Sequence, residues 1–498
     1  MEFSSHLLAI LAGFVGLLLV LFYKLRKQGI SGHQISDEGR VLAPEASGSL
    51  PFIGHMHLLG GQGQRTLAQT LGAMADKYGP IFTIRLGVFR AVTVSNHEAI
   101  KECFTTNDRV LANRPRSNAG TYLGYDHAGF GFAPYGEYWR EMRKLAMIEL
   151  LSTRRLETLK HVQVSEVNVL IKDLYLFCKK NEQSHNVEGN KMVISHKFEA
   201  MALNTIIRMI AGKRYFSDQH QENGEARHVT EVIKEFMYVS GLLAPSEVVP
   251  CLKWMDFFMG QVKSMKRVAN EIDSIVGKWV EEHKLKRVKN SEVDDNNNNY
   301  QDFIDLLLSA IEEDSMFGYT KDTIIKANVM NIFLAGSDTT SITLAWILSN
   351  LMNNRQAFKS AQEELDLKVG RNKWVQDCDI EKLVHLQAVI KETLRLYPPG
   401  PISVPHEARQ DCSISVYHVP KGQHFELIPF GSGRRSCPGM TLALQMTHLT
   451  IARLLQGFEL TTPFGEPVDM TEGLGITMPK ATPLEVIPSP RLPAAMYL

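Results

Sequence analysis

The feature that most constrains this chain is a glycine-rich loop around one cysteine, FGSGRRSCPG at Phe430–Gly439. Pro438 suits the first turn of a helix, and the residues after it, MTLALQMTHLTIARLL, predict a long and largely buried helix. Cys437 is therefore expected at a helix N-terminus, where the helix dipole and the free N–H groups stabilise a thiolate.

The residues around Cys437 favour a chemical role for it over a structural one. A lone cysteine in a turn is usually only a buried residue. Here Arg434 and Arg435 bring positive charge close to the sulfur, and glycines let the backbone approach another group. The joint placement of these residues indicates a metal ligand or a nucleophile; the set is Phe430, Gly431, Gly433, Arg435, Cys437 and Gly439.

Charge and cysteine content exclude two classes of protein. Lys+Arg and Asp+Glu are both 54, and this balance argues against bulk nucleic-acid binding, which needs a basic surface. The six cysteines are far apart and form no CxxC pair. They do not form a disulfide scaffold, and a reducing compartment fits the bulk of the chain.

The first residues predict a membrane anchor. Leu7–Tyr23 is an uncharged run, at the short limit for a spanning helix. A cleaved signal peptide is the alternative, but the preceding residues contain Glu2 and no Lys or Arg. Positive charge after the run places the rest of the chain in the cytosol by the positive-inside rule; it comes from Lys24, Arg26 and Lys27. We predict a retained anchor over residues 1–27.

The remaining chain predicts a mostly helical domain. Residues 28–49 are polar and then rich in Pro and Gly, which indicates a hinge, and residues 50–498 form the globular domain. Ile81–Leu86 and Ala91–Ser95 alternate like paired strands and predict a hairpin. Asp294–Asn299 is a polar loop. The expected fold class is mainly α with a minor β region.

A second motif, AGSDTT, lies at residues 335–340 within an apolar run from Thr323 to Met352. The run predicts a buried helix because it is hydrophobic on nearly every face. Thr339 can bond back to a backbone carbonyl. Asp338 is costly in so apolar a helix unless it is paired or used. From these residues alone, a solvated edge and a functional carboxylate are equally supported.

Two further pairs have helical spacing. Glu392 and Arg395 are three residues apart and share one face. Trp139 and Arg143 are four apart, so the guanidinium group can stack on the indole. Taken singly, both pairs are typical of ordinary helix surfaces.

The cysteine loop resembles the haem-binding signature of the cytochrome P-450 family, F-x-x-G-x-R-x-C-x-G, position by position. The resemblance implies that Cys437 is the axial thiolate ligand of the iron, that Arg435 pairs with a haem propionate and that Phe430 packs beside the sulfur. It also places Gly439 among the haem-binding residues. A thiolate ligand favours O–O cleavage.

The other motifs resemble the same family in chain order. AGSDTT is similar to its oxygen-activation motif, which implies that Asp338 and Thr339 relay protons and that Ala335 and Gly336 border the haem. W-x-x-x-R implies propionate contacts for Trp139 and Arg143, and VPHEAR implies another for His406. E-x-x-R implies a buried, structural pair of Glu392 with Arg395.

The chain is most similar to plant microsomal members, on FGSGRRSCPG, ANRP and KETLRLYPP. This implies the P-450 fold, haem b (iron protoporphyrin IX) and an endoplasmic reticulum membrane with a single-pass anchor and a cytosolic catalytic domain. It also implies O2, an NADPH-dependent P-450 reductase and a lipophilic specialised metabolite as substrate. Regional resemblance places substrate at Ser117–Asp126, Met330–Ala335, Ile402–Val404 and Gly473–Thr477.

The sequence departs from the family between Gly422 and Gln423. The family continues there with a strand, a short helix and a meander with a P-E-R-F-like motif, whereas here Phe430 follows within eight residues. In the family an arginine of this meander joins Glu392 and Arg395. Without it, a buried charged network is incomplete, which can cost several kcal/mol.

The sequence leaves three hypotheses beside a haem-thiolate monooxygenase. A haem-thiolate isomerase or dehydratase needs no dioxygen, and intact Asp338 and Thr339 count against it. A non-catalytic or misfolded product of a truncated transcript is favoured by the gap after Gly422. A membrane-tethered binding protein without haem would leave four matched motifs unexplained.

Overall fold

The computed structural model describes residues 41–59, 65–181, 190–216, 224–292, 301–312, 317–419 and 430–497. These residues form two compact units. Unit 1 comprises those within Met1–Pro115, Pro245–Trp254 and Val404–Leu427, and unit 2 those within Arg116–Ala244, Met255–Ser403 and Ile428–Leu498. The predicted anchor at 1–27 and the loop Asp294–Asn299 lie outside the described residues.

Unit 1 contains the predicted hairpin. Strands β1 (Ile81–Leu86) and β2 (Phe89–Val94) pair antiparallel, with Ile81 opposite Val94, which confirms the prediction. Gly87 makes the turn at φ +62°, a conformation that favours glycine. The other elements of unit 1 are α2 (Met56–Leu59), α3 (Leu67–Tyr78), α4 (His97–Phe104), α10 (Pro245–Val248), η2 (Pro250–Leu252), β4 (Cys412–Ile414) and β5 (Tyr417–Val419).

The folded chain begins earlier than the boundary predicted near Leu50. Leu42 bridges to His418 and Glu45 bridges to Thr83 of β1, while Ala46 is buried against Phe82. The Pro and Gly content correctly indicates turns, but it does not reveal that the intervening backbone pairs with strands. Residues 41–49 are therefore part of unit 1.

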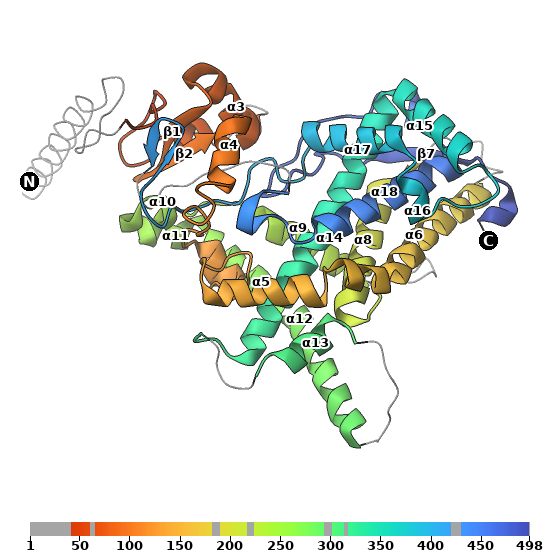
Figure 1. Ribbon diagram of the computed structural model, residues 1–498, viewed down its shortest axis with the longest axis horizontal. Coiled ribbons are helices and arrows are strands. Elements are labelled where there is room, and N and C mark those ends of the chain that lie inside the picture. Colours follow the sequence, from red (N-terminus) through yellow and green to blue (C-terminus); the bar gives the residue numbers. More distant parts are fainter. Residues whose placement is uncertain are drawn as a thin grey trace, which may run out of the picture. The chain divides into compact units, whose positions relative to one another are not determined.

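Unit 2 is built around one long helix, α14 (Lys321–Asn353), which confirms the buried helix predicted at Thr323–Met352. It packs against α8 (Ile194–Ala211), α12 (Gln261–Glu292) and α18 (Met440–Gly457) (Figure 1). Among the described residues, α14 is the one helix long and apolar enough to cross a membrane, but 78% of its most apolar window is buried inside the protein. It is thus a core helix of unit 2.

The strands described in unit 2 form one small sheet with the order β3-β7-β6 (Met192–Val193, Glu485–Pro490 and Phe458–Thr461). Together with the helices this confirms a mainly α fold with a minor β region. The remaining elements are η1 (Ala119–Leu123), α5 (Glu137–Glu149), α6 (Thr153–Asn181), α9 (Gly224–Ser240), α13 (Phe303–Ala310), α15 (Arg355–Lys368), α16 (Asp377–Ile380), α17 (Val384–Leu396), η3 (Gly433–Arg435), η4 (Pro463–Gly465) and η5 (Ala494–Met496); α11 (Lys253–Met259) crosses the boundary between the units in sequence.

Candidate active site

The cysteine loop is a closed turn that leads into α18. Phe430, Gly431 and Gly433 all have φ near +60°, and the N–H of Cys437 donates to the carbonyl of Phe430 over 2.7 Å. Gly439 is the N-cap residue of α18. Cys437 therefore lies just before the helix N-terminus, as predicted.

Cys437 is an exposed residue, although protein surrounds its thiol on most sides. This burial raises the pKa of the thiol, whereas the N–H of Gly439 and the charge of Arg143 lower it. The two groups that lower the pKa are those that stabilise a thiolate. A free thiol with such support is suited to bind a soft metal ion.

Two arginines, Arg143 of α5 and Arg435 of the cysteine loop, stand over the ring of Trp139, which is buried in α5. The guanidinium carbon of Arg143 lies 5.5 Å from the ring centroid and that of Arg435 lies 4.8 Å from it. Arg143 also donates to the carbonyl of Ser436 over 2.6 Å. Among the described residues, no carboxylate forms an ion pair with Arg143. Trp139, Arg143, Arg435 and Cys437 are thus one cluster.

The AGSDTT motif lies in the middle of α14, which is continuous through it. Ala335 is exposed although most of the helix is buried. A Cβ atom at Gly336 would lie 2.8 Å from Ile206 of α8, so glycine permits the close packing of the two helices. Thr339 donates to the carbonyl of Ala335 over 2.7 Å, which confirms the expected bond back to the helix.

Asp338 is not a solvated edge residue. Its Oδ2 atom is buried and has no hydrogen-bond partner among the described residues. Burial raises the pKa of the carboxyl to about 6.

The Glu392–Arg395 pair forms, but the expectation that it is buried is wrong. Two hydrogen bonds of 2.8 and 2.7 Å join the side chains. They are 56% exposed for Glu392 and 67% exposed for Arg395. Water therefore solvates both charges, because no other described part of the chain covers them.

His406 lies in unit 1. It is buried, its Nδ1 is 2.7 Å from the carbonyl oxygen of Leu111, and its ring packs edge-on against Phe104. These contacts are those of a structural histidine. Its role as a propionate contact stays a prediction.

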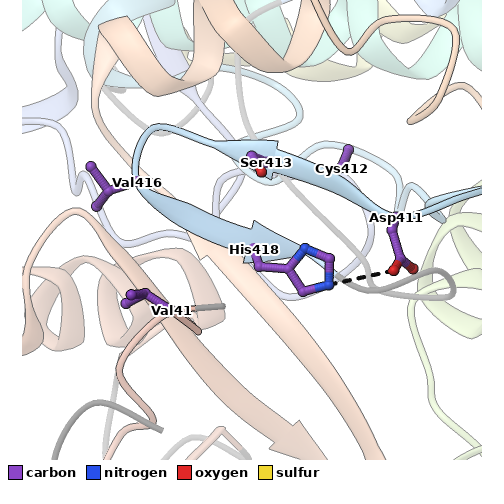
Figure 2. A pocket seen from close by; sticks show the side chains of 6 residues that line it. All are labelled: Val41, Asp411, Cys412, Ser413, Val416 and His418. Carbon is purple, nitrogen blue, oxygen red and sulfur yellow. Dashed lines mark ion pairs between the residues drawn. The ribbon is translucent and has the colours of Figure 1, made fainter. Parts of the chain in front are cut away.

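A pocket of about 530 Å³ in unit 1 is separate from these residues (Figure 2). Two of its side chains lie close together, with 3.5 Å between His418 Nε2 and Asp411 Oδ2. The lining contains none of the predicted site residues; it consists of Val41, Asp411, Cys412, Ser413, Val416 and His418.

The residues of unit 2 fit a haem group. Cys437 is an exposed residue whose thiol is free to bind iron, and Arg143 places a cation beside it that no described carboxylate neutralises. Ala335 leaves a small apolar surface uncovered in a helix that packs against α18. A planar, apolar ligand with anionic groups at one edge matches this donor set.

Comparison with known proteins gives the family. The cytochrome P450 family profile matches residues 44–427 and 422–485. Cytochrome P450 CYP82J17 of Trigonella foenum-graecum is 44% identical over 100% of this chain and 99% of its own length. Xanthotoxin 5-hydroxylase CYP82C4 of Arabidopsis thaliana is 42% identical over 97% of this chain and 98% of its own length. Nicotine N-demethylase CYP82E3 of Nicotiana tomentosiformis is 44% identical over 92% of this chain and 94% of its own length. The chain belongs to the cytochrome P450 family of haem-thiolate monooxygenases.

The comparisons also bear on the segment missing after Gly422. The family profile matches in two stretches that overlap at residues 422–427. The alignment with the Trigonella protein is 540 positions long and covers all of this chain, which has 498 residues, so 42 positions have no residue here. The break in the family match lies where the sequence predicts a deletion.

Proposed function

We propose that this protein uses NADPH and O2 to hydroxylate or epoxidise a lipophilic specialised metabolite, with haem b held by Cys437. The observation that carries the proposal is the free, exposed Cys437 just before α18, with Arg143 beside it. The hydroxylase and demethylase names of the relatives support the reaction class and the type of substrate.

The bound haem supplies the activation of dioxygen and the transfer of one oxygen atom. Cys437 would hold the iron through its thiolate. Arg143 and Arg435, which both stand over Trp139, would bind the propionates. The small, exposed Ala335 would let α14 lie close to the cofactor, while Gly336 lets α14 pack closely against α8. Phe430 and Gly439 would shape the cysteine loop.

Asp338 and Thr339 deliver protons. The pKa of Asp338 is raised to about 6, and a general acid works best when its pKa is near the working pH. Thr339 holds its hydroxyl hydrogen on the carbonyl of Ala335, so its oxygen remains an acceptor for a proton passed along the helix.

The location and the electron supply follow from the anchor and the microsomal resemblance. Residues 1–27 anchor the protein in the endoplasmic reticulum membrane, and the catalytic domain faces the cytosol. An NADPH-dependent P-450 reductase in the same bilayer supplies the electrons. The balance of 54 basic and 54 acidic residues fits a protein without a nucleic-acid partner.

The proposal is tested with the full chain and a P-450 reductase in membranes, supplied with NADPH, isotopically labelled O2 and a panel of lipophilic plant metabolites. We expect a product that carries one labelled oxygen atom, and no product from the Cys437→Ala variant. A product formed without NADPH or without label would show an isomerase or dehydratase instead.

A second candidate is a chain that carries the motifs without the chemistry. The exposed Glu392–Arg395 pair and the family match in two stretches favour it. Failure of the correctly folded protein to take up haem would establish it.

A further inference from the structure

We infer that Asn331 of α14 positions Arg435, the arginine assigned to a haem propionate, through the loop backbone at residues 129–133. The inference rests on the proposed function, because it concerns how a haem-binding residue is held. Hydrogen bonds run from Asn331 to this loop and from the loop to Arg435, all of them within unit 2.

The side chain of Asn331 is held by its own helix and bonds the loop. Its Nδ2 donates to the carbonyl of Ala327, one turn earlier, over 2.9 Å. Its Oδ1 accepts the N–H of Gly131 over 2.8 Å. Asn328, on the same face of α14, accepts the N–H of Phe130 over 3.3 Å. Two successive backbone N–H groups of the loop are therefore satisfied by side chains of α14, as buried backbone donors require.

The loop has the shape that this contact needs. A Cβ atom at Gly129 would overlap Nδ2 of Asn331, and one at Gly131 would overlap its Oδ1. Only glycine at these two positions lets the asparagine lie against the backbone. Phe130 is 8% exposed and Ala133 is fully buried. Because buried groups are closely packed, a change at Asn331 must move the loop.

The far end of the same loop holds Arg435. The carbonyl of Ala133, two residues beyond Gly131, accepts a hydrogen bond from Arg435 over 2.5 Å. The guanidinium group also stands over the ring of Trp139. The carbonyl and the ring together fix the orientation of the guanidinium plane, on which bidentate binding of a carboxylate depends.

This connection gives α14 two effects on the same site. Ala335, the exposed residue proposed to border the haem, lies about one turn beyond Asn331. Asn331 reaches Arg435 through the loop, so one helix sets both a haem-facing surface and an anion-binding arginine. A cation beside the haem disfavours further positive charge on the iron. A weaker hold on Arg435 should therefore lower the reduction potential of the bound haem.

The first test is hydrogen–deuterium exchange of the purified full chain in detergent, as isolated. We expect Asn331→Ala to speed exchange about fivefold in peptides that cover residues 129–133 and in those that cover the cysteine loop. Asn350→Ala is the matched control, because that asparagine of α14 donates to Thr393 of α17 instead. Asn331→Leu, which keeps the shape of the side chain, replaces the alanine variant if the latter does not fold.

Unchanged exchange in the cysteine loop would overturn the inference, as would an equal increase in Asn350→Ala. Faster exchange in both segments of a chain that forms no product would support the positioning role and contradict the proposed function. The two can therefore fail separately.

The second test is a redox titration of the haem-bound chain. We expect Asn331→Ala to lower the midpoint potential, with a shift of about threefold in the ferric-to-ferrous ratio. In an Arg435→Ala background the same substitution should cause no further shift, because residues that act through one another are not additive. Shifts that add would show that Asn331 acts independently of Arg435 and would overturn the inference.

Discussion

Arg143 connects the two halves of the cysteine cluster, since it donates to the carbonyl of Ser436 and stands over the ring of Trp139. We predict that Arg143→Ala reduces haem affinity about tenfold or more, the effect of one charge-assisted hydrogen bond. Haem content per protein after gel filtration measures this. Arg140→Ala, on the same helix, is the control, because Arg140 stands over Tyr135 instead. Equal haem loss in both variants would contradict the assignment.

The raised pKa of the Asp338 carboxyl group should make turnover depend on pH. Its pKa is about 6, so the carboxyl group is mostly protonated below that pH and mostly ionised above it. The wild-type turnover rate should change with pH, with a midpoint near this pKa. Asp338→Asn should abolish this pH dependence and lower turnover about a hundredfold. Substrate binding, measured by spectral titration, should be unaltered. A variant that retains the wild-type pH profile would exclude Asp338 from proton transfer.

The sequence identified the residues that motif spacing places, but not the properties that depend on packing. Cys437, Trp139 and Arg143 were found because fixed spacings on a loop and on a helix place them, and the structure brings all three together. The burial of a side chain depends on how distant parts of the chain pack, so the sequence could not distinguish the buried Oδ2 of Asp338 from a solvated carboxylate.

At the scale of elements, His283 joins α12 to α13. Its Nε2 is 2.7 Å from Oδ2 of Asp302, and its side chain is 1% exposed. Burial disfavours the charged ring, but the hydrogen bond and charge of Asp302 outweigh burial and raise the pKa of His283. The stabilisation is complete below the ordinary pKa of about 6.5 and is lost as the pH rises through the higher pKa of the folded state.

We therefore predict that His283→Gln lowers the free energy of unfolding by about 3 kcal/mol at about pH 6, and by less as the pH rises. Urea unfolding over a pH series measures the difference. His228→Gln is the control, because His228 is an exposed histidine near Glu271. A destabilisation that grows with pH would contradict the assigned direction.

For the exposed Glu392–Arg395 pair on α17 we expect little contribution to stability, in contrast to the buried His283–Asp302 pair. Glu392 and Arg395 are solvated, and exposed ion pairs add little to stability. We predict that Glu392→Gln leaves the melting temperature unchanged, whereas Glu166→Gln lowers it by breaking the pair with Arg208, in which Glu166 is 1% exposed. A large loss for Glu392→Gln would mean that another part of the protein covers the pair.

At this scale the sequence predicted the regular elements and missed their partners. The apolar runs predicted α14 and α18, and alternation predicted the β1–β2 hairpin. The pairing of residues 41–49 with strands and the His283–Asp302 link depend on tertiary packing, so no local pattern indicates them.

For the whole molecule, the central question is whether a chain without the segment after Gly422 holds haem. The cysteine cluster lies within unit 2 and draws its described contacts from α5, the cysteine loop and α18. None of these contacts involves the missing segment. We therefore expect haem binding to survive its loss.

The most direct test is a carbon monoxide difference spectrum of the dithionite-reduced full chain, with Cys437→Ala as control. A second sample carries the corresponding segment of the Trigonella relative between Gly422 and Gln423. The account predicts a strongly red-shifted Soret band in both chains and its loss in Cys437→Ala. An unshifted band, or none, in the natural chain would contradict it, most clearly if the chain with the inserted segment shows the shifted band.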